Sequence, residues 1–470
     1  MRITKSRFMV YNDSPIHFWA AAHGHISVSE ADPMMQYLAA QGYRAEPLAV
    51  QYLRDHVLPT YADAELIEQL ECANEPFFAR IDAAIYDRQA GVYDLYEIKS
   101  GTSPDKYVPD VAFQRTVFRS RMPIRRTFLV HLNGEYVRRG DLDLSQLFTH
   151  VQLDDAIDAV AESIVQLQHQ AHALLTLADP STLPPCTSPK DCPCPQICHP
   201  NLPEYSIYNI PHLKKGVKAE LRQHGIVSIH ALPVDTKIPA SATLHVAAMQ
   251  RGQNHIDWAA ISSHLDGYTY PLTFLDYEAA KQAIPLSGYR PNQDAAFQYA
   301  LAIIDHPGAT PRTAAHLSDG TGDFVRTLIE HLLNEMPAQG SVVVWNQSYE
   351  KGINKNMADA YPTYADALRH INERIVDLAD VFKDNYYVDP RFKGSWSIKA
   401  VLPALVPQLS YTDLAIANGG SAVLEWNRMV DPQTTATEQA RIRNDLLTYC
   451  GQDAWAMLEI WRFLQQNRPS

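Results

Sequence analysis

The stretch 271–278 constrains the fold of this chain most strongly, because it has the pattern of an apolar β-strand that ends in two acids. Side chains two positions apart on a strand face the same side, so Asp276 and Glu278 share one face. Two neighbouring carboxylates raise each other's pKa unless a cation lies between them. The stretch therefore predicts a divalent metal site, and the alternative is an exposed strand end with two solvated acids.

The length and composition indicate a multidomain globular protein. The 470 residues are enough for two or three domains, and the hydrophobic content of 46% and charged content of 20% are typical of soluble proteins. No apolar run is long enough to span a bilayer, and the N-terminus lacks the apolar segment of a signal peptide. We therefore expect a cytoplasmic protein without a membrane partner.

The net charge of −13 argues against a nucleic-acid binder that acts by electrostatics alone. Residues 111–126 depart from this balance, because they contain five arginines and no acid. A solvated helix face explains such a run, but in so acidic a chain we expect contact with an anion. The five residues are Arg115, Arg119, Arg121, Arg125 and Arg126.

The N-terminal third predicts two helices followed by a hairpin. Residues 4–22 have the pattern of a capped helix with a break at Ser14, and residues 34–56 that of a longer helix, which carries Glu46 and in which Pro47 marks a kink or a new first turn. Two strand patterns follow, Phe77–Asp87 and Val92–Lys99, joined by a Gly-containing turn.

The hairpin carries candidate chemistry. Glu97 and Lys99 share a face of the second strand, and Asp82 can lie beside them across the hairpin. Two acids can bind Mg²⁺ through oxygen ligands, and a lysine beside the metal can orient a water or stabilise charge on a phosphate. A chance Glu-x-Lys hairpin is the alternative.

This hairpin resembles the core of the PD-(D/E)XK nucleases, with Asp82 and Glu97-x-Lys99 at the matching positions. Gln114 on the next helix is similar to the Gln-x-x-x-Tyr element of the RecB-like and CRISPR-adaptation branches, with Phe118 in place of the tyrosine. The resemblance implies a restriction-endonuclease-like domain that binds Mg²⁺ or Mn²⁺. Its implied metal ligands are Asp82, Glu97 and Glu46, and its implied nucleic-acid contacts are Gln114, Arg115, Arg119, Arg125 and Arg126.

A proline-rich stretch follows a helical pattern at 154–177 and holds four of the six cysteines: Cys186, Cys192, Cys194 and Cys198. In a cytosolic chain, such a group indicates a metal or cluster site rather than disulfides. A stretch so rich in proline cannot build a hydrophobic core, so a bound metal is expected to hold it.

The resemblance to the RecB-like nucleases implies an iron–sulfur cluster at these cysteines. In those families one cysteine precedes the core and three follow it, and here Ser14 stands where the first is expected. Cys194 could supply the missing thiolate; the other readings are a Zn²⁺ site and a remnant without metal. After the cysteines, residues 203–265 resemble a helix-hairpin-helix unit around Gly225, or form a small helical connector.

The C-terminal half predicts alternating strands and helices. Strands are expected at 295–304 and 341–345, and helices at 323–336, 374–382, from 394 onward, and at 434–466. Asp377 falls on the second of these helices, where we expect a cap or surface role. Tyr449 and Asp453 are four residues apart on the last helix and share a face.

These elements resemble the DEDD superfamily of 3′–5′ exonucleases, which have a ribonuclease-H-like fold. The matching motifs are Asp276-x-Glu278, then Asn346-x-x-Tyr349-Glu350 with a glutamate where aspartate is usual, then Tyr449-x-x-x-Asp453. The resemblance implies two divalent ions about 3.5–4 Å apart. Their implied ligands are Asp276, Glu278, Asp453 and Glu350, and Tyr449 would orient the attacking water.

Taken together, the motifs predict an α/β protein with an N-terminal PD-(D/E)XK-like domain (1–180), a Cys-rich segment (181–202), a helical connector (203–265) and a ribonuclease-H-like domain with a mixed sheet flanked by helices (266–470). This combination, and residues 394–403 in particular, resembles a bacterial family of unknown function. We expect a nuclease that hydrolyses DNA or RNA with Mg²⁺ or Mn²⁺.

Two other functions fit the same sequence. One is a nucleic-acid-binding or regulatory protein with one or both sites decayed, which the departures at Ser14, Phe118 and Glu350 favour. The other is a redox- or metal-sensing scaffold built on the cysteines.

Overall fold

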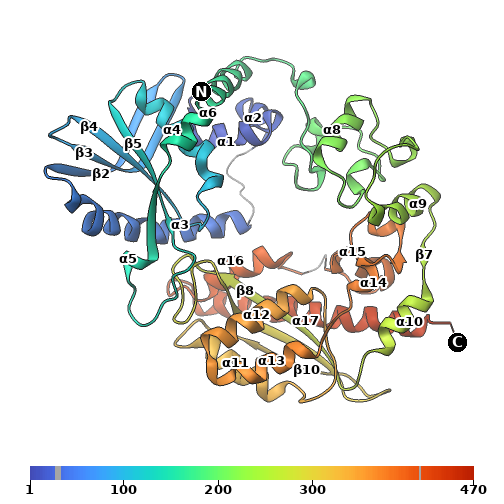
Figure 1. The fold of residues 1–470 in the computed structure, drawn as a ribbon. Helices are drawn as coiled ribbons and strands as arrows, with labels where there is room; N and C mark the ends of the chain where they lie inside the picture. Colours follow the sequence, from blue (N-terminus) through green and yellow to red (C-terminus); the bar gives the residue numbers. More distant parts are fainter. Residues whose placement is uncertain (27–32, 412–413, 470) are drawn as a thin grey trace. The chain divides into compact units, whose positions relative to one another are not determined.

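The computed structural model describes residues 1–26, 33–411 and 414–469 of a mixed α/β chain (Figure 1). The chain forms two compact units. Unit 1 comprises residues 1–200 and 281–293, and unit 2 comprises 201–280 and 294–470. All but the last two residues of the expected Cys-rich segment thus belong to unit 1, and the whole of the expected connector belongs to unit 2. Within the described ranges, no helix has the length and apolar character needed to cross a membrane.

Unit 1 is built on a six-stranded sheet with the order β1-β3-β4-β5-β6, in which β2 also pairs with β3. The strands are β1 (Ile3–Thr4), β2 (Ala64–Asn74), β3 (Phe77–Asp87), β4 (Val92–Lys99), β5 (Ile124–Leu132) and β6 (Phe148–Gln152). The predicted hairpin is confirmed: β3 and β4 have the expected bounds and pair antiparallel. No element is predicted above for β2, whose residues 64–71 alternate acids with apolar side chains only irregularly.

Helices cover both faces of this sheet, and the alternation of side chains along the strands explains how. Leu95 packs in one apolar cluster with Phe8 and Phe113, whereas the next residue, Tyr96, packs in another with Leu53. The helices are α1 (Lys5–Asp13), α2 (Pro15–Ala22), α3 (Pro33–Tyr52), α4 (Val108–Arg119), α5 (Leu144–Leu147) and α6 (Asp154–Leu174).

The predicted break between α1 and α2 is confirmed, because Ser14 ends one helix and begins the next. Pro47 lies inside the continuous helix α3. The Cys-rich segment contains little regular structure beyond one short helix, α7 (Pro195–Cys198). Residues 281–293 are tied into unit 1 by backbone contacts: Tyr37 donates to the carbonyl of Lys281, and Gln41 accepts from the amide of Ala283.

Unit 2 is built on a five-stranded mixed sheet with the order β10-β9-β8-β11-β12. The strands are β8 (Leu272–Lys281), β9 (Asp294–Ile304), β10 (Arg312–Leu317), β11 (Val342–Val344) and β12 (Ile375–Asp377), and β7 (His255–Ile256) pairs separately with β13 (Tyr387–Val388). Strand β11 is parallel to β8 and β12, and β10 is antiparallel to β9.

The helices of unit 2 include two that lie against opposite faces of β8. Cys450 of α17 contacts Asp276, whereas Tyr277, the next residue, donates to Asn354 of α12. The helices are α8 (Lys215–Gln223), α9 (Thr243–Arg251), α10 (Trp258–Asp266), α11 (Phe324–Glu335), α12 (Gln347–Ala360), α13 (Ala365–Glu373), α14 (Asp380–Lys383), α15 (Ile398–Leu405), α16 (Gly419–Met429) and α17 (Ala436–Gln466).

Two expectations for this half were wrong. Residues 374–382 do not form one helix: Ile375–Asp377 is strand β12, which pairs parallel with β11, and only α14 follows as a short helix. Pairing with a neighbouring strand overrides the weak helical pattern of these β-branched residues. Around Gly225, α8 is followed by a single 3₁₀ turn, Ile229–Ala231, rather than by a second α-helix.

Candidate metal centres

Three carboxylates of unit 2 converge at the end of β8. Asp276 and Glu278 project from this strand, and Asp453 projects from α17. Each offers an oxygen, and these oxygens all lie within 4.8 Å of one another. Glu278 and Asp453 are buried, while Asp276 is partly exposed. The predicted sharing of a face by Asp276 and Glu278 thus holds, and α17 brings the third acid to them.

The three acids oppose one another's ionisation. Burial and the Asp453 carboxylate raise the pKa of Glu278 to about 8, although Lys399 acts in the opposite direction. Burial raises the pKa of Asp453 to about 6, against the hydrogen bond from Tyr411 and the charge of Lys399. The pKa of Asp276 is raised well above its ordinary value by burial and by both neighbours. Such a cluster becomes fully ionised near neutral pH only if a cation joins it.

Glu350, in the first turn of α12, is a fourth acid near this group. Its side chain is buried, and its Oε2 atom accepts no hydrogen bond from the described residues. Burial raises the pKa of Glu350 to about 8, and its charge contributes to the raised pKa of Asp276. A buried carboxylate oxygen without a donor is costly, and a bound cation would remove that cost.

Asp377 is not a fifth member of the group. It ends β12 rather than lying on a helix, and it is buried. Its carboxylate accepts from the amides of Gln347 and Ala379, at 3.0 Å each, and from Lys383 at 2.7 Å. These donors satisfy Asp377, so its role is to fix the start of α12.

Two residues beside the cluster were not predicted as site residues. Lys399 of α15 donates to the Tyr449 hydroxyl at 3.1 Å, and Tyr411 donates to Asp453. Lys399 lies within the 394–403 stretch whose resemblance is described above, so a signal for it existed. Tyr411 lies outside any motif of the sequence.

The donor set fits a hard divalent cation. Carboxylate oxygens at close spacing are the ligands that Mg²⁺ and Mn²⁺ prefer, and here three such groups meet with a fourth, Glu350, nearby.

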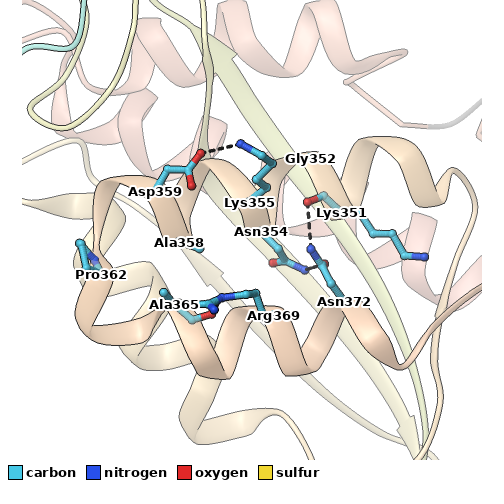
Figure 2. Close-up of a pocket in the computed structure, with 10 residues that line it drawn as sticks. All are labelled: Lys351, Gly352, Asn354, Lys355, Ala358, Asp359, Pro362, Ala365, Arg369 and Asn372. Atoms are coloured by element: carbon cyan, nitrogen blue, oxygen red, sulfur yellow. Dashed lines mark hydrogen bonds and ion pairs between the residues drawn. The ribbon is translucent and has the colours of Figure 1, made fainter.

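A separate pocket lies between α12 and α13, and Figure 2 shows the residues that line it. Its basic side chains include Lys355, which pairs with Asp359 at 2.6 Å. None of the clustered acids lines this pocket.

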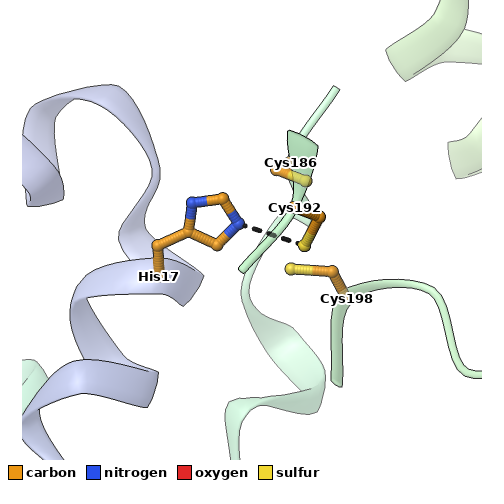
Figure 3. A group of neighbouring side chains, drawn as sticks. All are labelled: His17, Cys186, Cys192 and Cys198. Carbon is orange, nitrogen blue, oxygen red and sulfur yellow. Dashed lines mark hydrogen bonds between the residues drawn. The ribbon is translucent and has the colours of Figure 1, made fainter. Parts of the chain in front are cut away.

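A second group of possible ligands lies in unit 1 and contains three of the four predicted cysteines. Cys186, Cys192 and Cys198 meet His17 of α2, and their ligand atoms all lie within 4.8 Å of one another (Figure 3). His17 was not predicted. His17 lies 175 positions before Cys192 in the sequence, and only its proximity to Ser14 could have suggested it.

Cys194 and Ser14, the other residues considered for this site, lie outside the group of four. The Cys194 thiol is buried, 3.8 Å from that of Cys198, among the apolar residues Ile16 and Trp19. Ser14 is also buried, and its hydroxyl has no hydrogen-bond partner in the described chain.

The hairpin of unit 1 gathers the residues predicted for its site. Glu97 is buried and accepts from Lys99, from Gln114 and from Lys5 of α1, at 2.7 Å each. Lys99 also pairs with Asp110 at 2.7 Å. Lys5 and Asp110 were not predicted as site residues. Glu97 thus accepts from two lysines and an amide, whereas Glu350 of unit 2 has a carboxylate oxygen without a donor among the described residues.

The two hairpin acids differ in their ionisation. Burial acts to raise the pKa of Glu97, but Lys99 and Lys5 lower it to about 2. Burial and the charge of Glu97 raise the pKa of Asp82 to about 7. Glu46 of α3 accepts from Gln69, a residue of β2 with a φ of 53° that stands opposite Asp82 of β3 in the register. Phe118, at the position of the expected tyrosine, is buried in the core.

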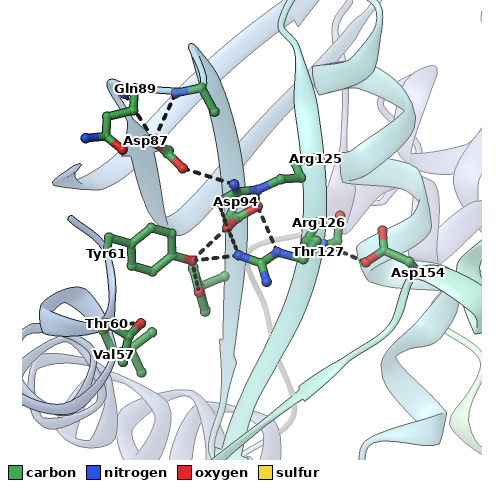
Figure 4. Close-up of polar contacts among 12 residues, drawn as sticks. Val57, Thr60, Tyr61, Asp87, Gln89, Asp94, Arg125, Arg126, Thr127 and Asp154 are labelled. Atoms are coloured by element: carbon green, nitrogen blue, oxygen red, sulfur yellow. Dashed lines mark hydrogen bonds and ion pairs between the residues drawn. The ribbon is translucent and has the colours of Figure 1, made fainter. Parts of the chain in front are cut away.

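Four of the five arginines of 111–126 form ion pairs within unit 1, and Arg121 donates to Asn74. Arg115 is buried and pairs with Asp154 and Asp158, and Arg119 lies near the same two acids. Arg125 and Arg126 both pair with the buried Asp94, to which Tyr61 also donates (Figure 4). Acids of unit 1 therefore balance the charge of these arginines. Their role in nucleic-acid binding stays a prediction.

Comparisons with known proteins give a partial match. Residues 273–397 match the family described as "Domain of unknown function (DUF2779)". The chain is 29% identical over 142 residues to "Uncharacterized protein UU173" of Ureaplasma parvum serovar 3, which covers 27% of this chain and 21% of that protein. It is 29% identical over 164 residues to "Uncharacterized protein MG366 homolog" of Mycoplasma pneumoniae, covering 32% and 24%.

The chain thus spans less than a quarter of the length of these curated relatives. No solved structure matches it. The similarity to the DUF2779 family lies in the segment from β8 to the residue before α15, which includes Asp276, Glu278 and Glu350.

Proposed function

We propose that unit 2 is a metal-dependent 3′–5′ exonuclease domain with a ribonuclease-H-like fold. The observation that carries the proposal is the convergence of Asp276, Glu278 and Asp453 within 4.8 Å, buried or half-buried. The sheet order β10-β9-β8-β11-β12, with β8 central and carrying the first two acids, supports the fold. Two further acidic and tyrosine motifs on α12 and α17 support the reaction.

The carboxylates of Asp276, Glu278 and Asp453 would hold Mg²⁺ or Mn²⁺, with Glu350 as a further ligand directly or through water. The bound ions would lower the pKa of a water and offset the charge that develops on the phosphate. Glu350 would approach the ions from the first turn of α12, with a side chain one methylene longer than that of aspartate.

The remaining residues hold the nucleophile. Tyr449 accepts a hydrogen bond from Lys399 through its oxygen, which leaves its own proton to be donated. That hydroxyl lies beside Asp453, whose pKa it lowers by hydrogen bonding. Here the proton is donated to Asp453, so Tyr449 would hold a water through its remaining lone pair, or through that proton once a metal ion takes the Asp453 oxygen. Water is the nucleophile, so no covalent intermediate forms.

Unit 1 is proposed to hold a second, PD-(D/E)XK-like nuclease site. The gathering of Asp82, Glu97, Lys99 and Gln114 favours it. For Glu97 to bind a metal, Lys5 or Lys99 must leave its Oε1 atom, which both now contact. The same contacts favour the alternative, a unit that binds nucleic acid without cleaving it.

End-labelled single-stranded DNA and RNA, incubated with Mg²⁺ or Mn²⁺, test these roles. We expect shortening from the 3′ end by the wild-type protein, its loss in Asp276→Asn, and its retention in Asp82→Asn. Asp359→Asn is the matched control, because this acid is exposed on α12 and pairs only with Lys355 among the contacts described. Absence of any cleavage with Mn²⁺, or equal cleavage by Asp276→Asn, would overturn the exonuclease proposal.

A further inference from the structure

The group formed by His17 and three cysteines joins two distant parts of unit 1. His17 lies on α2, and Cys186, Cys192 and Cys198 lie in the proline-rich segment after α6. The Nε2 atom of His17 is 3.4 Å from the Sγ of Cys192, although the two residues are 175 positions apart. Four potential ligands that converge from such distant positions indicate a site rather than a chance cluster along one loop.

We propose that His17, Cys186, Cys192 and Cys198 bind one zinc ion. Three thiolates and one imidazole are a common ligand set for structural zinc, and the four together complete a tetrahedron. In this assignment His17, rather than Cys194, is the fourth ligand, and the bound metal is a single ion rather than an iron–sulfur cluster. It does not depend on the nuclease activity proposed for either unit.

The spacing of the ligand atoms favours a single ion over an iron–sulfur cluster. With Zn–S bonds of about 2.3 Å, tetrahedral geometry places thiolate sulfurs roughly 3.8 Å apart, and a nitrogen ligand somewhat closer. The observed separations, all within 4.8 Å, need only small side-chain movements to reach these values. In a four-iron cluster each thiolate binds a different iron, and the ligands must stand well outside the cube.

Cys194 and His199 lie beside the four proposed ligands and have other roles. Cys194 is fully buried and packs with Ile16 and Trp19, so it forms the apolar backing of the site. His199 lies with its Nε2 atom 3.2 Å from the Sγ of Cys186. A ring N–H at this place can donate to a metal-bound thiolate, which is the ordinary function of an outer partner.

A zinc ion at this site would link residues 180–200 to helix α2. Residues 180–200 contain seven of the 31 prolines and contribute few residues to a core. Their apolar contacts are with the small cluster around Trp19. The Trp19 ring also donates to the carbonyl of Leu177 at 2.7 Å. Binding of zinc to residues from α2 and from this segment adds its free energy to folding of the segment. Removal of zinc should therefore loosen the segment first.

The test is metal analysis of the full chain purified without added metal, once in air and once under anaerobic conditions. We expect about one zinc per chain, no iron and no visible absorbance in both preparations. His17→Ala should lose most of the zinc, His17→Cys should restore it, and Cys194→Ser should retain it. Iron with visible absorbance in the anaerobic protein would establish a cluster and overturn the proposal.

A measurement on the wild-type chain covers the case in which variants do not fold. Zinc is removed with a chelator and Co²⁺ is added, because tetrahedral Co²⁺ with thiolate ligands gives intense absorption bands. Zinc should then displace Co²⁺ and abolish the bands. Absence of these bands, absence of any bound metal, or zinc retention by His17→Ala equal to wild type would each overturn the assignment of the four ligands.

Discussion

The Nζ atom of Lys399 on α15 lies 3.1 Å from the hydroxyl oxygen of Tyr449 on α17 and 5.0 Å from the centroid of the Tyr449 ring. The same charge acts on Glu278 and Asp453. Lys399 therefore hydrogen-bonds the Tyr449 hydroxyl, and its positive charge also lowers the pKa of Glu278 and of Asp453. It links the proposed nucleophile-holding group to the proposed metal ligands.

This pair predicts the effect of removing either partner. Tyr449→Phe should lower kcat for 3′-end hydrolysis by about 10²-fold, because a positioned donor contributes roughly that factor to a proton-linked step. Lys399→Met should act in the same direction. KM for the oligonucleotide should change little in Tyr449→Phe. Lys355→Met, an exposed lysine on α12, serves as the control and should leave kcat unchanged.

The acid cluster predicts a dependence of stability on pH. The pKa of Glu278 and that of Glu350 are each about 8 in the folded protein, against an ordinary value of 4.5, because burial opposes their ionisation. At these two groups the folded state therefore binds more protons than the unfolded state between these values, so their contribution to stability falls as the pH rises from 4.5 to about 8.

Thermal unfolding in EDTA and in Mg²⁺ across this pH range checks the prediction. The difference between wild type and Glu278→Gln isolates the site from other titrating groups. Without metal, the wild type should lose stability relative to Glu278→Gln as pH rises, and Mg²⁺ should raise the Tm of the wild type alone. A pH-independent difference would contradict the assignment.

Opposite charges around Asp276 and Glu97 predict opposite effects of neutralising them. Asp276→Asn removes repulsion with Asp453 and Glu278, so it should raise the Tm of the metal-free protein. Glu97→Gln leaves Lys5 and Lys99 without their shared partner and should destabilise unit 1 by about 3 kcal/mol. Denaturant unfolding of both variants in EDTA measures the contrast, with Glu68→Gln, an exposed pair with Arg54, as control.

The Asp94 network predicts sensitivity to acid. Burial acts to raise the pKa of Asp94, but hydrogen bonds from Arg125, Arg126 and Tyr61 lower it below the ordinary 3.8. A lowered pKa contributes stability above pH 3.8 that is lost as the pH falls through the folded value. Asp94→Asn should cost about 2 kcal/mol at pH 7, and the difference from wild type should shrink below pH 4.

Urea unfolding at pH 7 and at acid pH measures this difference. Asp63→Asn is a suitable comparison, because it removes an acid whose pair with Arg88 is half exposed. We expect no measurable change there. A cost for Asp94→Asn that persists unchanged in acid would show that its effect does not arise from the ionised carboxylate.

Local patterns in the sequence were sufficient for much of the fold. The hairpin β3–β4 is confirmed at its predicted bounds, as is the strand at Asp294–Ile304 to within one residue. Helix α17 begins two residues later than expected and carries Tyr449 and Asp453 on one face. These features depend on side-chain period, turns and caps, which are set by residues a few positions apart.

The tertiary structure alone decided which groups meet. Only the proximity of His17 to Ser14 links it in sequence to the cysteine site, and nothing near Glu97 indicates Lys5. Pairing with β11 turned Ile375–Asp377 into a strand and gave Asp377 its donors. Charge balance and ligand identity depend on contacts between residues many positions apart. The sequence alone therefore determined where the acids of β8 and α17 lie along the chain, and packing of α17 against the sheet determined that Asp276 and Asp453 face each other.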